Sequence, residues 1–306
     1  MKLLNGIVPI LTHIGLEVNA YFRIKNYDAV IADCEKVING APNFPDAYII
    51  RGDAYGTKGI YHKAVADYKT GLEKGFDPNR LFSIDKSNKS DMWFCGAMYM
   101  EIVANRFLGK SDVVAKYENW LKTVCDKNGV TRAEIEAYYR DGIRGLIADI
   151  VNEEFNKISF MADINAQASY DCVLTRNPQN GHYTLSYERA SVANSNKTLT
   201  APSLNALLAE MRNGENKADF TPAVINTVRA QAALIPAVAY PASTINEVVN
   251  TIVDFYLNPN TNTFNALRSR YRTFLLSDGQ RGKETAIAFS NVLYNLSIGL
   301  NKKLSE

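Results

Sequence analysis

The N-terminal part of this chain repeats itself with a period of 34 residues, and this repeat constrains the fold more than any other feature. Such a period is typical of stacked helical hairpins, in which each unit buries its apolar face against the next. Shifting the sequence by one period superimposes five identical pairs: Ala20 and Ala54, Tyr21 and Tyr55, Tyr27 and Tyr61, Ala32 and Ala66, and Asp33 and Asp67.

The second copy of the repeat predicts a pair of helices. Tyr48, Gly52 and Tyr55 fall on one stripe of the first helix. We expect Gly52 to let the two helices approach closely, and Gly59 to end the first helix with a positive φ. We expect Pro78 to stop the second helix. The inward stripe of that second helix is Tyr61, Ala64, Tyr68 and Gly71.

Residues 11–78 therefore resemble two repeats of the tetratricopeptide family. The resemblance implies a protein-binding scaffold, because in this family the first helix of each repeat lines a groove for a partner's peptide or helix. The chain lacks the lysine of the family's carboxylate clamp, since Gly15 stands there, and Ile50 replaces its second asparagine. A chaperone C-terminal peptide is therefore not the expected partner. The groove residues carried over by position are Asn19, Phe22, Arg23, Asp46, Ile49, Ile50 and Asp53.

The groove has an alternative interpretation, in which these side chains form a solvated helix face and the repeats dock against the rest of the chain.

Stacked repeats generally need three or more units for stability. We therefore expect residues 91–125 to form a divergent third helix pair around Gly109. Next, Thr131 and Glu134 have the spacing of a capping box, which predicts that a long helix begins there.

The apolar pattern changes near residue 168 from helical to alternating. Two alternating stretches flank the turn residues 177–181, which predicts a β-hairpin. Because two strands alone are marginally stable in water, the hairpin must pack on helices, gain a third strand or pair with a neighbouring subunit. The alternating apolar residues of the predicted hairpin are Tyr170, Cys172, Leu174, Tyr183, Leu185 and Tyr187. The segment 191–200 that follows is rich in Ser, Asn and Thr and is interpreted as a loop.

Helical periodicity returns after residue 200, so the sequence predicts a mainly α fold with four parts. These are a tetratricopeptide-like helical stack over residues 1–126, a long capping or connecting helix over 127–160, a β-hairpin and loop over 161–200, and a helical domain over 201–306. Within the last part, Thr221 and Pro222 mark a capped helix start.

Composition and charge exclude several classes of partner. The net charge of +2 gives no electrostatic reason to expect nucleic acid. Arg268 and Arg272 share a helix face but Arg270 does not, so we interpret this group as a solvated surface. No stretch is long and apolar enough for a membrane span. We expect other proteins, or a second copy of this chain, as partners, and no small molecule.

No catalytic or metal-binding pattern stands out. The three histidines lie in separate predicted elements, and the four cysteines have no metal-ligand spacing. Glu153 and Glu154 are interpreted as solvated helix residues. We therefore expect no cofactor, no metal and no catalytic residue. The leading hypothesis is a non-enzymatic scaffold or adaptor, a subunit of a larger assembly, that binds partners through the groove, the hairpin or both. The alternatives are a self-assembling structural subunit and an enzyme of unrecognised type in the C-terminal half with a repeat docking arm.

The compartment stays open at this stage. Scattered cysteines slightly favour a reducing, cytoplasmic environment. The opening Met1–Leu4 resembles the start of a signal peptide, but Asn5, Gly6 and Pro9 interrupt the apolar run, so we interpret it as structural. A processed envelope protein carrying a new Met1 is equally compatible with this pattern.

Overall fold

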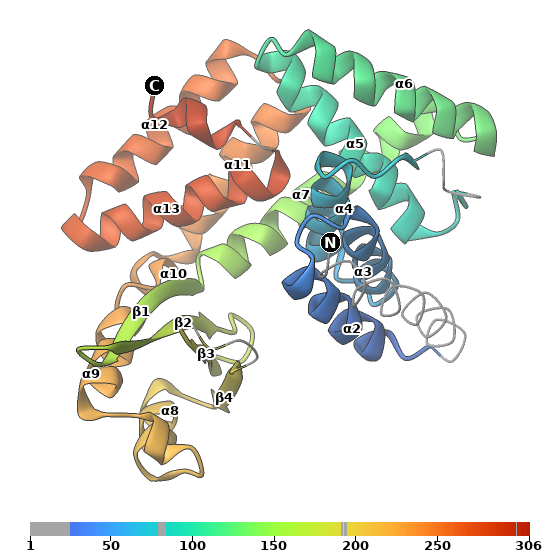
Figure 1. Cartoon of the computed structure of the whole chain (residues 1–306). Coiled ribbons are helices and arrows are strands. Elements are labelled where there is room, and N and C mark those ends of the chain that lie inside the picture. The colour runs from blue at the N-terminus through green and yellow to red at the C-terminus, as the bar shows by residue number, and fades with distance from the viewer. Residues whose placement is uncertain (1–24, 79–83, 191, 193–194, 298) are drawn as a thin grey trace. The chain divides into compact units, whose positions relative to one another are not determined.

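The computed structural model describes residues 25–78, 84–190, 192, 195–297 and 299–306. Within these residues the chain is mainly helical and contains one four-stranded antiparallel sheet (Figure 1). It divides into two compact units. The N-terminal unit comprises Met1–Leu146 with Tyr294–Leu300, and the C-terminal unit comprises Ile147–Leu293 with Asn301–Glu306. One division between the units falls inside a helix, after Leu146.

The described part of the N-terminal unit is a succession of helices, each in contact with the next as far as α6. Helix α3 also contacts α5, so helices two apart in the chain lie together as well. The helices are α2 (Tyr27–Gly40), α3 (Pro45–Thr57), α4 (Tyr61–Glu73), α5 (Lys89–Phe107), α6 (Ser111–Asn128) and the first part of α7 (Arg132–Glu154).

Two glycines allow α3 and α4 to pack closely. A Cβ atom at Gly52 would lie 2.5 Å from Cε1 of Tyr68, and one at Gly71 would lie 2.5 Å from Cδ1 of Ile49. Each helix thus has a glycine opposite a large side chain of the other, which confirms the expectation for Gly52. Helix α3 ends at Thr57, and Gly59 follows with φ +78°, as expected.

Helix α4 ends earlier than predicted. It stops at Glu73, and Gly75 follows with φ +97°, so a residue that tolerates positive φ ends the helix before Pro78 is reached. Helix α5 is buried on nearly all sides, because its large apolar residues face α3, α4 and α6. It is the central helix of the N-terminal unit.

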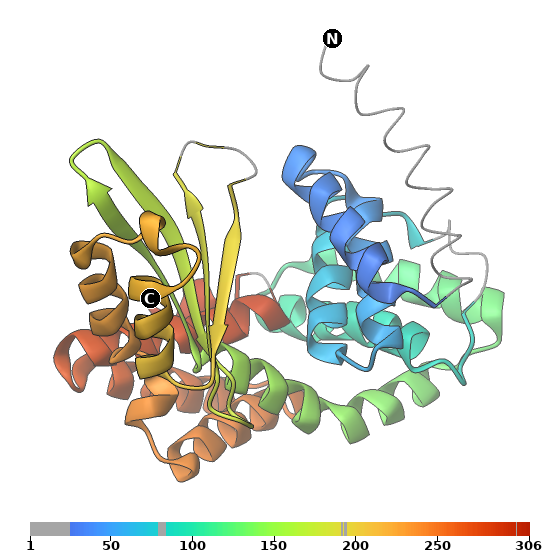
Figure 2. The same cartoon turned by 90° about the horizontal axis from the view of Figure 1, so that it is seen from below.

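The C-terminal unit contains a sheet whose strands follow one another in the order β1-β2-β3-β4 (Figure 2). The strands are β1 (Lys157–Asn165), β2 (Ala168–Arg176), β3 (Tyr183–Arg189) and β4 (Lys197–Ala201). The predicted hairpin corresponds to β2 and β3, and Tyr170, Cys172, Leu174, Leu185 and Tyr187 point to its buried face. The hairpin gains a strand on each side and packs on helices of its own unit.

One row of apolar residues crosses all four strands in register. Ile158 pairs with Leu174, Leu174 with Leu185, and Leu185 with Leu199. All four are buried against α8 (Leu204–Asn213) and α9 (Pro222–Ala232), which cover this face. The other face exposes residues such as Met161, and a hollow of about 380 Å³ lies on it.

Two predictions about this region were wrong. The helix expected to reach residue 160 ends at Glu154, and β1 starts at Lys157. The reason is the change from helical to alternating burial at Ile158, Phe160 and Ala162, which the helical stripe before it obscured. The segment predicted as a loop contains β4, because Leu199 and Ala201 bury one side of an otherwise polar strand.

The remaining elements of the C-terminal unit are helical. Thr221 caps α9 by accepting a hydrogen bond from the Val224 amide, and Pro222 is its first residue, as predicted. Asn260 and Thr263 form a capping box at the start of α12. The elements are α10 (Pro236–Ala239), α11 (Ala242–Leu257), α12 (Thr261–Leu276), α13 (Gly279–Leu296) and the short 3₁₀ helices η2 (Lys217–Asp219) and η3 (Asn301–Leu304).

Candidate binding pocket between helices α6 and α7

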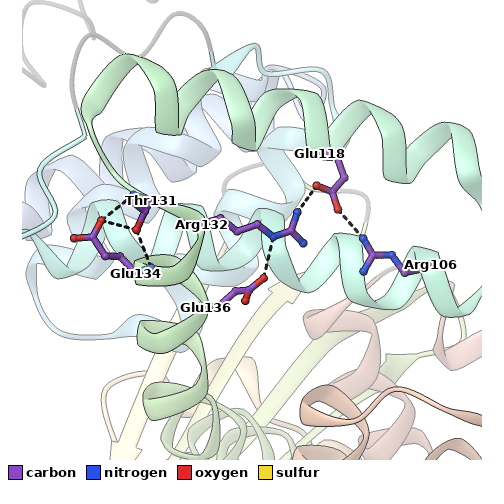
Figure 3. A network of polar contacts seen from close by, with 6 residues as sticks. All are labelled: Arg106, Glu118, Thr131, Arg132, Glu134 and Glu136. Carbon is purple, nitrogen blue, oxygen red and sulfur yellow. Dashed lines mark hydrogen bonds and ion pairs between the residues drawn. The ribbon is translucent and has the colours of Figure 1, made fainter.

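Side chains of alternating charge connect three helices of the N-terminal unit. Arg106 of α5 donates to Glu118 of α6 at 2.6 Å. Glu118 also accepts from Arg132 of α7 at 2.6 Å, and the Arg132 Nε donates to Glu136 at 2.9 Å. Figure 3 shows how Arg132 lies between the two carboxylates. The guanidinium also lies 5.8 Å from the centroid of the Tyr99 ring.

A capping box fixes the start of α7, as the sequence predicted. The Thr131 amide donates to Glu134 Oε2 at 2.8 Å, and the Glu134 amide donates to Thr131 Oγ1 at 3.2 Å (Figure 3). Glu134 Oε1 also accepts a hydrogen bond from the Lys86 ammonium. The hydrogen bonds to the Glu134 carboxylate, first from the Thr131 amide and then from Lys86, lower its pKa to about 2. Glu134 therefore stays ionised over the physiological range, and the first turn of α7 stays capped.

A pocket of about 660 Å³ lies between the C-terminal half of α6 and the capped start of α7. Leu121 and Val130 are buried beside it, and Gly129 makes the tight turn between the helices with φ +65°. The pocket is lined by Glu118, Asn119, Leu121, Lys122, Cys125, Asp126, Gly129, Val130, Thr131 and Arg132. The alternating charges thus position both walls of the pocket.

The charged groups around the pocket are paired within the chain. Lys122 donates to Asp126 at 2.5 Å, one helical turn away. The hydrogen bonds to Glu136 and Glu118 raise the pKa of Arg132, which stays a cation. Burial and the nearby Asp126 raise the pKa of the Cys125 thiol above its usual range. This thiol is therefore protonated near neutral pH and is a poor nucleophile.

This arrangement suits binding better than chemistry. A pocket with an apolar floor and a polar rim accepts an apolar group and orients it by hydrogen bonds at the edge. An acid–base mechanism would need an unpaired titratable group directed into the pocket. Here the ionisable side chains of Glu118, Lys122, Asp126 and Arg132 neutralise one another.

The groove residues predicted from the repeat do not gather at this pocket. Asn19, Phe22 and Arg23 lie outside the described residues. Ile49 is 3% exposed and packs against Gly71, and Ile50 packs against the cluster around Val30. These two side chains therefore contribute to the packing between helices in this structure. Asp46 is half-buried in the first turn of α3.

Asp53, the last predicted groove residue, belongs to a buried hydrogen-bonded chain. The Tyr68 hydroxyl donates to Asp53 at 2.9 Å, and it lies 2.7 Å from the Ser90 hydroxyl. Burial raises the pKa of Asp53 to about 7, although the Tyr68 hydrogen bond acts against this shift. Asp53 therefore links α3, α4 and α5 internally.

The remaining candidate groups of the sequence lie apart from the pocket. Cys34, Cys95 and Cys172 are buried free thiols, and burial raises the pKa of each to about 12. Glu154 is buried and pairs with Lys157, so its interpretation as a solvated residue was wrong. Arg270 of α12 forms an ion pair with Glu247 of α11.

Over the described ranges, no group of three or more His, Cys, Asp or Glu side chains could hold a metal ion. The helices in those ranges include none with the length and apolar character needed to cross a membrane. No family model, curated protein or solved structure matches the chain.

The pocket itself was not predicted from the sequence. The capping box at Thr131 gave the start of α7, but Glu118 and Arg132 are fourteen residues apart and share no local pattern. The signal in the sequence that could have indicated the pocket is the group of opposite charges at Glu118, Arg132 and Glu136, on two successive predicted helices. It becomes informative only when the structure brings these side chains together.

Proposed function

We propose that this protein is a non-enzymatic scaffold that binds other proteins through its N-terminal unit, and that the α6–α7 pocket is a contact site. The single observation that carries the proposal is the pocket of about 660 Å³, whose floor is apolar and whose rim charges are already paired. An apolar side chain from a partner segment fits this chemistry, because it needs no compensating charge in the pocket.

The helices leading to the pocket support the same function. Each packs on its neighbour, and Gly52 and Gly71 allow the close approach that the resemblance to tetratricopeptide repeats implies. Under this proposal, α2 to α4 belong to such repeats and the divergent pair α5 and α6 continues the stack. Ile49, Ile50 and Asp53 then hold the stack together, and Asp46 lies in the first turn of α3.

Site-specific photo-crosslinking tests the proposal. A photoreactive amino acid replaces Asn119, an exposed residue on the pocket wall, in the full-length chain. A matched control carries the same group at Ala115, exposed one helical turn earlier on α6 and outside the pocket lining. We expect a discrete crosslinked protein from an extract of the native source with Asn119, and at most a faint one with Ala115.

Two results would contradict the proposal. One is the absence of any crosslinked protein from the Asn119 position, and the other is the same set of proteins from both positions. Crosslinking exclusively to a second copy of the chain would favour the self-assembling subunit instead. That outcome would appear as a product of twice the 34.1 kDa chain mass.

A further inference from the structure

The segment Tyr294–Leu300 at the end of α13 belongs with the N-terminal unit, and two buried polar side chains hold it there. Lys69 of α4 is 3% exposed and donates a hydrogen bond to the backbone carbonyl of Tyr294. Its ammonium group also lies 4.5 Å from the centroid of the Tyr294 ring. Glu101 of α5 is 2% exposed and accepts a hydrogen bond from the Ser297 hydroxyl at 3.5 Å.

The charges in this buried cluster do not balance. Lys69 faces two carboxyl groups, those of Glu73 one turn along α4 and of Glu101 on α5. The Asn105 side chain donates to Glu101 Oε2 at 2.9 Å. Within the described part of the chain, Oε1 of Glu73 and Oε1 of Glu101 are buried without a hydrogen-bond partner. A buried carboxylate oxygen that lacks a donor favours the protonated form.

Titration of the cluster follows from this geometry. Burial raises the pKa of Glu101 to about 7 and raises that of Glu73 as well, while burial lowers the pKa of Lys69. From α6, Tyr117 faces both acids, and burial followed by their charges raises its pKa. On the far side of the segment, the Lys110 ammonium lies beside Gly299. Glu101 thus titrates near neutral pH.

We propose that Lys69, Glu73 and Glu101 form a pH-sensitive latch, which holds Tyr294–Leu300 on the N-terminal unit at mildly acidic pH and weakens as the pH rises. Protonation of Glu101 removes one of the two carboxylate charges that can face Lys69, and Ser297 and Asn105 still contact its carboxyl group. When Glu101 ionises, its buried Oε1 carries negative charge without a donor among the described residues. The docked segment then costs more free energy to maintain.

The sign of the pH dependence follows from linkage. A carboxyl group whose pKa is raised on docking contributes stability below its ordinary value of 4.5, and this contribution is lost as the pH rises to about 7. Lys69 acts in the opposite direction, because its lowered pKa favours docking as the pH rises. The Glu101 contribution must therefore be isolated by substitution.

Hydrogen exchange of the full-length chain, followed by mass spectrometry, measures docking of the segment directly. After correction for the intrinsic exchange rate, we expect the protection of residues 294–300 to fall roughly tenfold between about pH 5.5 and about pH 7.5. In the Glu101→Gln variant, position 101 no longer titrates, so the protection should change by less than about twofold over the same range. The Asp112→Asn variant, at an exposed residue of α6, should behave like the wild type.

Two results would overturn the latch. The first is constant protection of the wild-type segment at every pH, and the second is an unchanged pH dependence in Glu101→Gln. If circular dichroism shows that Glu101→Gln does not fold, the Glu73→Gln variant takes its place. That substitution removes the negative charge nearest to Lys69 and Glu101, so a midpoint that stays unshifted would equally contradict the proposal.

Discussion

The interior of the N-terminal unit and its exposed α6–α7 edge use the same kinds of charged residue in opposite ways. At the edge, Arg132 lies between Glu118 and Glu136 with its side chain 44% exposed, and these partners are 29% and 35% exposed. In the interior, Lys69 and Glu101 are almost completely buried, and Oε1 of Glu73 and of Glu101 lack a donor among the described residues. The edge therefore positions helices at little energetic cost, whereas the interior responds to pH. Substitutions can break or sharpen this contrast.

The largest expected effect comes from removing the buried cation. In Lys69→Met, Glu73 and Glu101 lose the positive charge that offsets them, and breaking a buried pair costs about 3–5 kcal/mol. We expect the free energy of unfolding in urea to fall by about this amount near pH 8. The loss should be clearly smaller near pH 5.5, where the carboxyl groups take up protons. An equal loss at both pH values would show that packing, not charge, explains it.

A smaller effect is expected from filling the close contact between α3 and α4. In Gly52→Ala, the new Cβ would lie 2.5 Å from the Tyr68 ring, so the ring or the helix must shift. Overpacking of this kind costs about 1–3 kcal/mol. The matched control is Gly145→Ala on α7, where no described residue lies within 4 Å of the new atom. That variant should be unchanged or slightly more stable, because alanine favours a helix more than glycine does. Thermal unfolding of both variants measures the difference.

The next prediction concerns how the free energy of unfolding depends on pH through a second buried carboxyl group, that of Asp53. Burial raises the pKa of Asp53 to about 7, so its contribution to stability is present below the ordinary value of 3.8 and is lost as the pH rises to about 7. In Asp53→Asn, the Tyr68 hydroxyl keeps an acceptor and the charge is gone. Between about pH 5 and about pH 7.5, we expect the free energy of unfolding in urea to fall by about 2 kcal/mol more for the wild type than for this variant. Identical pH profiles would contradict the role of burial.

The smallest effect is expected at the exposed edge. In Arg132→Met, the hydrogen bonds to Glu118 and Glu136 are lost, but exposed ion pairs contribute only about 0.2–1 kcal/mol. The loss should shrink in about 1 M salt, because salt screens exposed charges more than buried ones. The Lys69→Met variant should show no such shrinkage. A loss at Arg132 as large as that at Lys69 would remove the contrast between the two regions.

The sequence predicted the parts of the fold that depend on local patterns. Gly52 and Gly59 were placed correctly because close approach and positive φ each require glycine in a recognisable position. The capping box at Thr131 and Glu134 and the hairpin of β2 and β3 also depend on neighbours in the chain. The tetratricopeptide resemblance stays a prediction.

Features that depend on distant residues could not be predicted in this way. Strand β1 pairs with β2 through contacts such as Ile158 with Leu174, and its apolar residues continue the pattern of α7 closely enough to be taken for helix. The pocket needs Glu118 and Arg132 to meet across two helices. The buried cluster joins Lys69 to Tyr294, 225 residues later, and no local pattern reports such a contact.

The most direct test of the scaffold proposal is the affinity of the crosslinked partner for two tryptophan variants, measured by isothermal titration calorimetry. Asn119→Trp places a large side chain at the wall of the pocket, whereas Ala115→Trp places it one turn away, outside the lining. We expect at least a roughly tenfold loss of affinity for the first variant and less than a twofold change for the second, because an occupied pocket excludes the partner's side chain. Equal affinities for both variants and the wild type would contradict the α6–α7 pocket as the binding site.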